Sequence, residues 1–138
     1  MSAALEANRA TVRAFYADLW ERGDLGCLPA LMHEDVGFQG TFGQVMRGRE
    51  AFAAYVRSVR GAFSAYRCEL RDLLAEEERV AARVGFSGQH DAGPFLDVPP
   101  TGRRLAWEGV GFFTLEEARI RHLWVMGDML GLMGQLRP

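Results

Sequence analysis

Residues 66–90 read YRCELRDLLAEEERVAARVGFSGQH, and this stretch decides the fold. The three glutamates in its middle separate two runs of strand length, residues 66–75 and 79–90. Two more runs of the same kind follow, at residues 103–115 and 119–126. A segment rich in Pro and Gly precedes the third run, and a Glu-Glu pair precedes the fourth, so turn signals bound each of them. The sequence therefore predicts a four-stranded antiparallel meander.

Helical periodicity marks the N-terminal half of the chain. Residues 3–22 carry one apolar stripe, whose members recur every three, four or seven positions: Leu5, Val12, Phe15, Tyr16, Leu19 and Trp20. Gly23 suits a left-handed cap at the end of this helix, and Asp24 suits the N-cap of a short helix over residues 25–32. Residues 48–63 place apolar and Arg side chains on opposite faces, which predicts a third helix.

Two short elements complete the predicted fold, a strand over residues 35–42 and a C-terminal helix over residues 128–136. Helices followed by a long meander are typical of an α+β domain in which the helices cover one face of a curved sheet. The 138 residues predict a single domain spanning residues 1–138. A curved sheet covered by helices on one face forms a cone, and it leaves an apolar space between the two layers, where small-molecule sites commonly lie.

Composition excludes several classes of function. The formal net charge is −2, which gives no basic surface for nucleic acid or an anionic membrane. All 16 basic residues are Arg, so any mechanism that needs a lysine Schiff base or a P-loop lysine is excluded. No segment reaches the roughly 20 apolar residues of a membrane span.

The expected compartment is the cytoplasm. The first 15 residues, MSAALEANRATVRAF, lack the basic and apolar regions of a signal peptide. Cys27 and Cys68 show no CxxC spacing and are expected to be buried thiols rather than a disulfide or a metal site. His33, His90 and His122 form no short-range ligand pattern, so a metal site is not expected.

Asp128 has two opposed interpretations. Strand alternation places it on one face with Ile120, His122, Trp124 and Met126, and an apolar pocket there would raise its pKa and make it a candidate acid or base. Asp128 also directly precedes the predicted C-terminal helix, where an N-cap would lower its pKa instead. The two interpretations predict opposite shifts, and the residue pattern leaves both open.

Other candidate site residues come from the strand and helix faces. His90 ends an alternating apolar run and is expected to point into the pocket, either as a structural residue or as a polar group of the site. Tyr16, Trp20, Trp107 and Trp124 belong first to the core and are expected to contact a flat hydrophobic ligand. An outer sheet face is expected to carry these residues, for solvent or for a second subunit: Arg83, Arg104, Arg119 and Arg121.

Four segments together resemble the SnoaL-like polyketide cyclases, the ester cyclase group of the NTF2-like superfamily. They are FYADLWERGDLGCLPALMHEDVGF at residues 15–38, the predicted helix after Gly48, FSGQHDAGPFLDVPPTGRRLAWEGVGFF at residues 86–113 and IRHLWVMGDMLGLMGQL at residues 120–136. The most specific features are the PPTGR turn, which begins at Pro99, and the W-x-x-x-D spacing of Trp124 and Asp128.

The resemblance implies a cofactor-free NTF2-like cone, typically a homodimer joined through the outer sheet face. It implies that Asp128 is the acid and base of an aldol-type ring closure on a hydrophobic carbonyl ester, and that His90 hydrogen-bonds a substrate oxygen. Gln39 stands where many relatives carry a histidine, and it can hydrogen-bond a substrate but cannot shuttle protons.

The alternatives are functions that the same cone also supports. They are a non-catalytic binding domain for small molecules, another NTF2-like isomerase or hydrolase, and a protein–protein adaptor with a filled pocket.

Overall fold

The computed structural model describes residues 2–41 and 43–138. Its elements in chain order are α1 (Ala3–Ala14), the π-helix η1 (Phe15–Glu21), the 3-10 turn η2 (Leu25–Cys27), α2 (Leu28–Leu31), β1 (Met32–Gln39), β2 (Val45–Arg47), α3 (Arg49–Arg60), β3 (Ser64–Glu76), β4 (Arg79–Gln89), β5 (Arg104–Glu116), β6 (Arg119–Gly127) and α4 (Met129–Leu136). The fold is α+β, as the sequence predicts.

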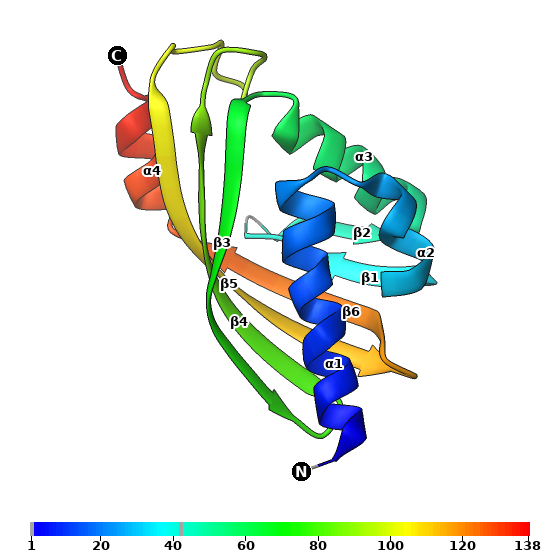
Figure 1. Cartoon of the computed structure of the whole chain (residues 1–138). Helices are drawn as coiled ribbons and strands as arrows, with labels where there is room; N and C mark the ends of the chain where they lie inside the picture. Colours follow the sequence, from blue (N-terminus) through cyan, green and yellow to red (C-terminus); the bar gives the residue numbers. More distant parts are fainter. Residues whose placement is uncertain (1, 42) are drawn as a thin grey trace.

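The strands form one curved six-stranded sheet in the order β2-β1-β6-β5-β4-β3 (Figure 1). The predicted meander is confirmed, because β3, β4, β5 and β6 are neighbours in antiparallel pairs. β1 pairs with β6 in parallel, which the sequence did not predict. β1 also begins earlier than expected, at Met32, and Phe42 at the end of the predicted strand lies outside the described residues.

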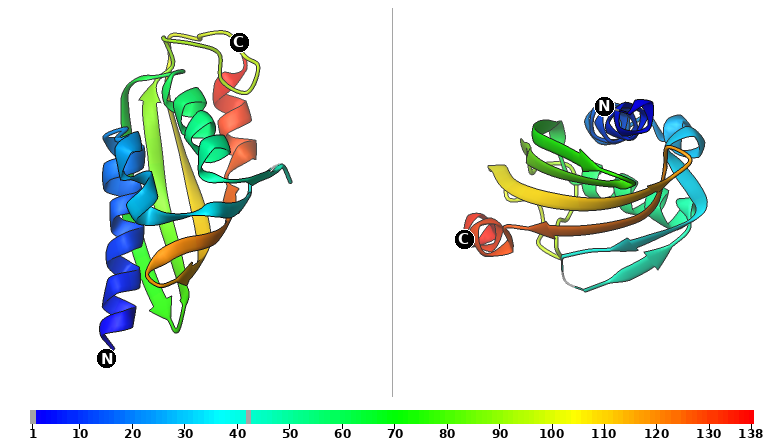
Figure 2. Two further views of the ribbon diagram at one scale, coloured as in Figure 1. Left: turned by 90° about the vertical axis from the view of Figure 1, so that its right-hand side faces the viewer. Right: turned by 90° about the horizontal axis from the view of Figure 1, so that it is seen from below.

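α1, α2 and α3 lie over the concave face of the sheet, whereas α4 lies on the other side of it (Figure 2). α1 and η1 form the helix predicted over residues 3–22, and Gly23 ends it with φ of 73°. Asp24 accepts a hydrogen bond from the Gly26 amide and so caps the next turn. The short helix is cut to η2 and α2, because the chain becomes extended at Met32.

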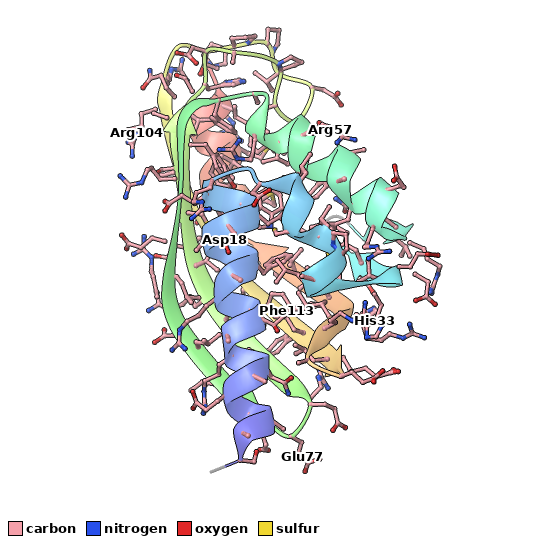
Figure 3. The ribbon with its side chains drawn as sticks, turned by 45° about the vertical axis from the view of Figure 1, so that its right-hand side comes forward. Asp18, His33, Arg57, Glu77, Arg104 and Phe113 are labelled. Atoms are coloured by element: carbon pink, nitrogen blue, oxygen red, sulfur yellow. The ribbon has the colours of Figure 1, made fainter. Side chains whose placement is uncertain are left out.

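The core lies between the helices and the inner face of the sheet. Val80, Ala82 and Val84 alternate along β4 and are buried there. Phe113 of β5 packs under the first helix, with its ring 5.2 Å from that of Phe15, whereas Arg104 of the same strand points from the opposite face (Figure 3). Burial of these apolar side chains is what fixes the helices on one side of the sheet.

The outer face is polar at the Arg positions that the sequence singles out. Arg83 binds Asp72 at 2.7 Å and Glu108 at 3.0 Å, and Arg121 binds Asp35 at 2.5 Å. Arg104 donates to the Ser87 hydroxyl at 3.0 Å. These groups are solvent-accessible, so each pair adds little to stability.

The two cysteines differ. Cys68 is buried, as predicted, and burial raises the pKa of its thiol to about 12. Cys27 is only half-buried, so the prediction is wrong for this residue. It lies in η2 at the edge of the helical layer, where its Sγ donates to the Asp24 carbonyl at 3.0 Å.

No helix within residues 2–41 and 43–138 combines the length and the apolar character that crossing a bilayer requires.

Two glycines test the packing in opposite directions. Gly88 faces inward on β4, and an added Cβ would lie 2.9 Å from the Phe63 ring. We expect Gly88→Ala to lower the free energy of unfolding by about 1–3 kcal/mol through overpacking. Gly134 in α4 has open space around it, so Gly134→Ala should raise the same quantity by about 0.5–1 kcal/mol. Urea denaturation measures both, and equal effects would contradict the packing described.

Candidate functional site

A π-helix forms one wall of the main pocket. In η1 the Arg22 amide donates to the Ala17 carbonyl, five residues earlier, rather than four as in an α-helix. Three aromatic residues of this segment line the pocket: Phe15, Tyr16 and Trp20. π-helical turns occur frequently at functional sites. The wide turn therefore belongs to the pocket and not only to the core.

The pocket lies between the helices and the sheet and is lined mainly by aromatic and aliphatic side chains. α3 contributes Phe52, Tyr55 and Val59. The sheet and the loops contribute Phe38, Thr41, Gln44, Tyr66, Val84, Phe86, Phe95, Leu96, Trp107, Gly109, Val110, Leu123, Val125, Met126 and Gly127, and α4 contributes Met129. Among the described residues, no Asp, Glu, His or Arg side chain belongs to this lining. A flat hydrophobic ligand fits such walls.

Three tyrosines, Tyr16, Tyr55 and Tyr66, are among the residues that line the pocket. Burial raises the pKa of Tyr16, Tyr55 and Tyr66, so all three hydroxyls are neutral near pH 7 and can donate hydrogen bonds. The Tyr66 hydroxyl is buried and has no hydrogen-bond partner among the described residues. The Arg60 guanidinium lies 5.5 Å from the centroid of the Tyr66 ring. Tyr66 therefore presents a donor that an oxygen of a bound molecule can satisfy.

The connection between β1 and β2 contributes the remaining polar groups. Thr41 and Gln44 line the pocket, and the Thr41 hydroxyl accepts a hydrogen bond from the Gly127 amide at 3.0 Å. This contact ties the loop to the end of β6.

Tyr16, Trp20 and Trp107 lie in the pocket wall, where the sequence analysis expected them. Their part in ligand binding stays a prediction.

Trp124 and Gln39 do not lie in the pocket, so their predicted placement is wrong. They are register partners on β6 and β1, next to Leu123 and Phe38, which do line the pocket. Since side chains alternate, both project from the outer face. The Trp124 ring packs there on the Phe112 ring at 5.6 Å.

Asp128 is also on the outer side, and its predicted placement in an apolar pocket is wrong. The predicted face-sharing of His122, Trp124 and Met126 is correct, but this face is the convex one, and of these three residues Met126 alone also borders the pocket. A bulge at Arg121 places Ile120 on the inner face instead. Asp128 is exposed, and its Oδ1 accepts a hydrogen bond from the Gly131 amide at 2.9 Å. The N-cap interpretation is confirmed, and no observation tests a catalytic role.

His90 and His33 make structural contacts. His90 is fully buried beside the pocket but does not belong to its lining, so the prediction that it points into the pocket is wrong. It follows β4 at the start of the loop that carries Phe95, and its ring packs against Phe63 behind the pocket wall. His33 Nε2 lies 2.8 Å from the Glu116 carbonyl oxygen. The described residues contain no cluster of three metal-binding side chains.

Sequence reasoning missed most of the wall, including Phe38, Tyr55, Tyr66 and Phe86. Tyr66 was detectable, because it alternates with exposed neighbours on β3, and Phe86 was detectable because it shares a strand face with the buried residues Ala82, Val84 and Gly88 of β4. The loop residues Phe95 and Leu96 carried no such signal, since a loop has no fixed period.

The family model for SnoaL-like polyketide cyclases matches residues 10–136. The chain belongs to this family. A proposed SnoaL-like polyketide cyclase from Jannaschia sp. CCS1 superposes with a TM-score of 0.91 at 22% identity, over 100% of this chain and 98% of the other. TsrD from Streptomyces laurentii superposes with a TM-score of 0.84 at 28% identity, over 99% and 97%.

IdmH from Streptomyces antibioticus, a proposed polyketide cyclase, superposes with a TM-score of 0.81 at 22% identity, over 94% of this chain and 97% of the other. The likeness to the Jannaschia protein and to IdmH shows the NTF2-like fold alone. The search of curated proteins finds no match.

Tyr66→Phe tests the unsatisfied phenol. Removing a buried hydroxyl without a partner should leave the free energy of unfolding unchanged or raise it by up to about 1 kcal/mol, because the desolvation cost disappears. Thermal and urea denaturation of the ligand-free protein measure this change. A loss of more than about 1 kcal/mol would mean that the hydroxyl has a partner in the folded chain.

Proposed function

We propose that this protein binds a flat hydrophobic carbonyl compound of the polyketide type and promotes its aldol-type ring closure without an acid or base of its own in the pocket. The observation that carries the proposal is the lining, which joins aromatic walls to the neutral phenols of Tyr16, Tyr55 and Tyr66. Membership of the SnoaL-like cyclase family supports the same reaction class.

The pocket contributes shape and hydrogen bonds. A ligand carbonyl that accepts from Tyr66 becomes more polarised, and negative charge on its oxygen is stabilised as the adjacent carbon loses a proton to water. The enolate carbon then attacks a second carbonyl carbon of the same molecule and forms the new C–C bond. The second carbonyl oxygen becomes an alkoxide and takes up a proton, so the product is an isomer of the substrate. Aromatic walls hold the two reacting carbons close together.

An acid–base role of Asp128 is the competing mechanism that the family resemblance implies. It requires the carboxylate to leave the Gly131 amide and reach the pocket from the outer side. Gly127 and Met129 on either side of Asp128 line the pocket, so a local change at this junction would bring the carboxylate nearer.

Asp128→Asn and Tyr66→Phe distinguish these mechanisms. Asn is also a good N-cap, so Asp128→Asn removes the base and keeps the helix. With an aryl poly-β-keto methyl ester as substrate, we expect kcat/KM to fall about 10- to 100-fold in Tyr66→Phe and to stay within about threefold in Asp128→Asn. Product absorbance measures the rate. A loss of about 1000-fold in Asp128→Asn would establish the acid–base mechanism instead.

Non-catalytic binding is the second candidate, and the absence of a base among the described lining residues favours it. Tight binding of the same ester by the unmodified protein, with no acceleration of its cyclisation over buffer, would assign the protein to this class.

We also propose a homodimer that joins two outer sheet faces. An apolar patch, called the outer patch below, lies on the outer face of β5 and β6. It consists of Val110, Phe112, Trp124 and Met126. Phe112 is 42% exposed and Met126 is 47% exposed. Leu74 of β3 pairs with Ala81 of β4, which pairs with Phe112, so Leu74 extends the outer patch across the sheet. Its side chain is 71% exposed. In a dimer with a two-fold axis, the outer face of one subunit packs on the same face of the other, and the apolar area of both faces is removed from water.

Phe112→Glu tests the dimer, because it places a charge in the outer patch without touching the core. We expect it to shift sedimentation from dimer to monomer at micromolar concentration, since two buried carboxylates would face each other. Ala54→Glu on the exposed face of α3 is the matched control and should remain dimeric. A monomeric parent protein, or a dimeric Phe112→Glu variant, would refute this interface.

A further inference from the structure

Arg60, the last residue of α3, binds the C-terminal end of η1. Its Nε donates to the Trp20 carbonyl at 2.7 Å, and its Nη2 donates to the Glu21 carbonyl at 2.9 Å. The last carbonyls of a helix lack partners within it, and a cation beside them is favourable. Gly23 leaves room for the guanidinium, because a Cβ added there would collide with it. Arg60 therefore fixes the end of the helix whose aromatic side chains line the pocket.

The charge of Arg60 has no carboxylate partner in the part of the chain that the structure describes. Glu21, whose carbonyl Arg60 binds, turns its carboxylate to β3 instead. Its Oε1 accepts from the Cys68 amide at 3.1 Å and from Arg67 Nε at 3.2 Å. An arginine side chain does not lose its proton in a protein. A half-buried, unpaired positive charge therefore lies behind the pocket wall.

This charge lies over the ring of Tyr66. The central carbon of the Arg60 guanidinium is 5.5 Å from the ring centroid, a distance at which a cation is attracted to the face of the ring. The hydroxyl of the same ring is buried and has no hydrogen-bond partner among the described residues. Burial raises the pKa of Tyr66 well above its ordinary value, and the Arg60 charge opposes this rise. Arg60 therefore favours negative charge at the phenol end of Tyr66.

A bulge in β3 sets the direction of Tyr66. Ala65 and Tyr66 together oppose the single residue Gly88 of β4, because the register shifts by one residue there. Ala65 has φ of 50°, a left-handed value that glycine usually supplies at such a bulge. Backbone strain of this kind persists where the surrounding structure holds it, and it is common at functional sites. The bulge and Arg60 thus fix the same phenol from its backbone and from its ring.

We propose that Arg60 is a positioning residue that makes the Tyr66 subsite prefer the anionic form of a bound molecule, an enolate or a phenolate, over its neutral form. Arg60 acts through the ring of Tyr66 and does not touch the ligand. The inference rests on the proposed function, because it assigns the charged oxygen of the ligand to the subsite that Tyr66 forms. A substrate that has lost its proton to water then keeps its negative oxygen at Tyr66 while the C–C bond forms.

The other titratable groups around Tyr66 come from η1, α3 and β3. They are Tyr16, Tyr55 and Cys68, and burial raises the pKa of each, so all three are neutral near pH 7. The charged side chains of Glu21 and Arg67 pair with each other at 3.2 Å. Between about pH 5 and 9, a titration of a bound phenol therefore reports the proton of the ligand itself.

The ionisation of bound 4-nitro-1-naphthol tests the inference, because this flat molecule carries an acidic hydroxyl and its anion absorbs at a longer wavelength. Absorbance against pH at saturating protein gives the midpoint. We expect Arg60→Met to raise the midpoint by about one pH unit, since loss of a positive charge favours the protonated ligand. Arg60→Lys should restore most of the parent value. Arg57→Met removes a charge from the exposed side of the same helix and, as the matched control, should keep it.

The same titration in the Tyr66→Phe background tests the route through the phenol. Arg60→Met should then move the midpoint by less than about 0.5 unit, because the hydroxyl that carries the effect is absent. An equal shift in both backgrounds would overturn the positioning role.

Fluorenone, a flat ketone that does not ionise, separates the charge of Arg60 from its contacts with η1. We expect Arg60→Met to change fluorenone affinity by less than about threefold. A merely structural role would weaken the binding of fluorenone and of the naphthol anion alike, and that result would also overturn the inference. Quenching of tryptophan fluorescence measures the binding, since Trp20 and Trp107 line the pocket.

The outcomes separate this inference from the proposed function. An unchanged midpoint in a folded Arg60→Met variant, or in Arg60→Gln if Arg60→Met does not fold, overturns the role of Arg60 and leaves the proposed function intact. Failure of the parent protein to bind either fluorenone or the naphthol contradicts the proposed function and the inference with it.

Discussion

The alternation of side chains along β4, β5 and β6 is the constraint on which the rest of the molecule depends. On each strand every second side chain faces the helices and builds the core and the pocket, whereas its neighbours form the outer face. One extra residue changes this assignment, as the bulge at Arg121 shows. Through it Ile120 joins the core, while Trp124 and Asp128 remain outside. The chemistry available to the pocket follows from this partition.

The pocket that results is apolar, and its polar groups are neutral. Its hydrogen-bond donors include the phenol of Tyr66. A phenol donates without changing its charge near pH 7. In such surroundings a hydrogen bond to a developing negative charge is stronger than it is in water.

The sequence predicts the large elements because each repeats its period several times. The helix over residues 3–22 and the four-strand meander belong to this group. β2 has three residues and shows no period, and the parallel pairing of β1 with β6 depends on contacts far apart in the chain. In the site, Tyr16, Trp20 and Trp107 follow from helix and strand faces. The position of Asp128 does not follow from them, because alternation shows which residues of a strand share a face but not which of the two faces meets the helices.

The pH dependence of fluorenone affinity is the most direct test of a pocket that works through neutral donors. Fluorenone does not ionise, and burial raises the pKa of the three lining phenols, so none of these groups changes its charge between about pH 5 and 9. The dissociation constant measured by tryptophan quenching should therefore stay constant across this range. A change of about tenfold, with a midpoint typical of a carboxylate or an imidazole, would show that an ionisable group takes part in binding and would contradict this account.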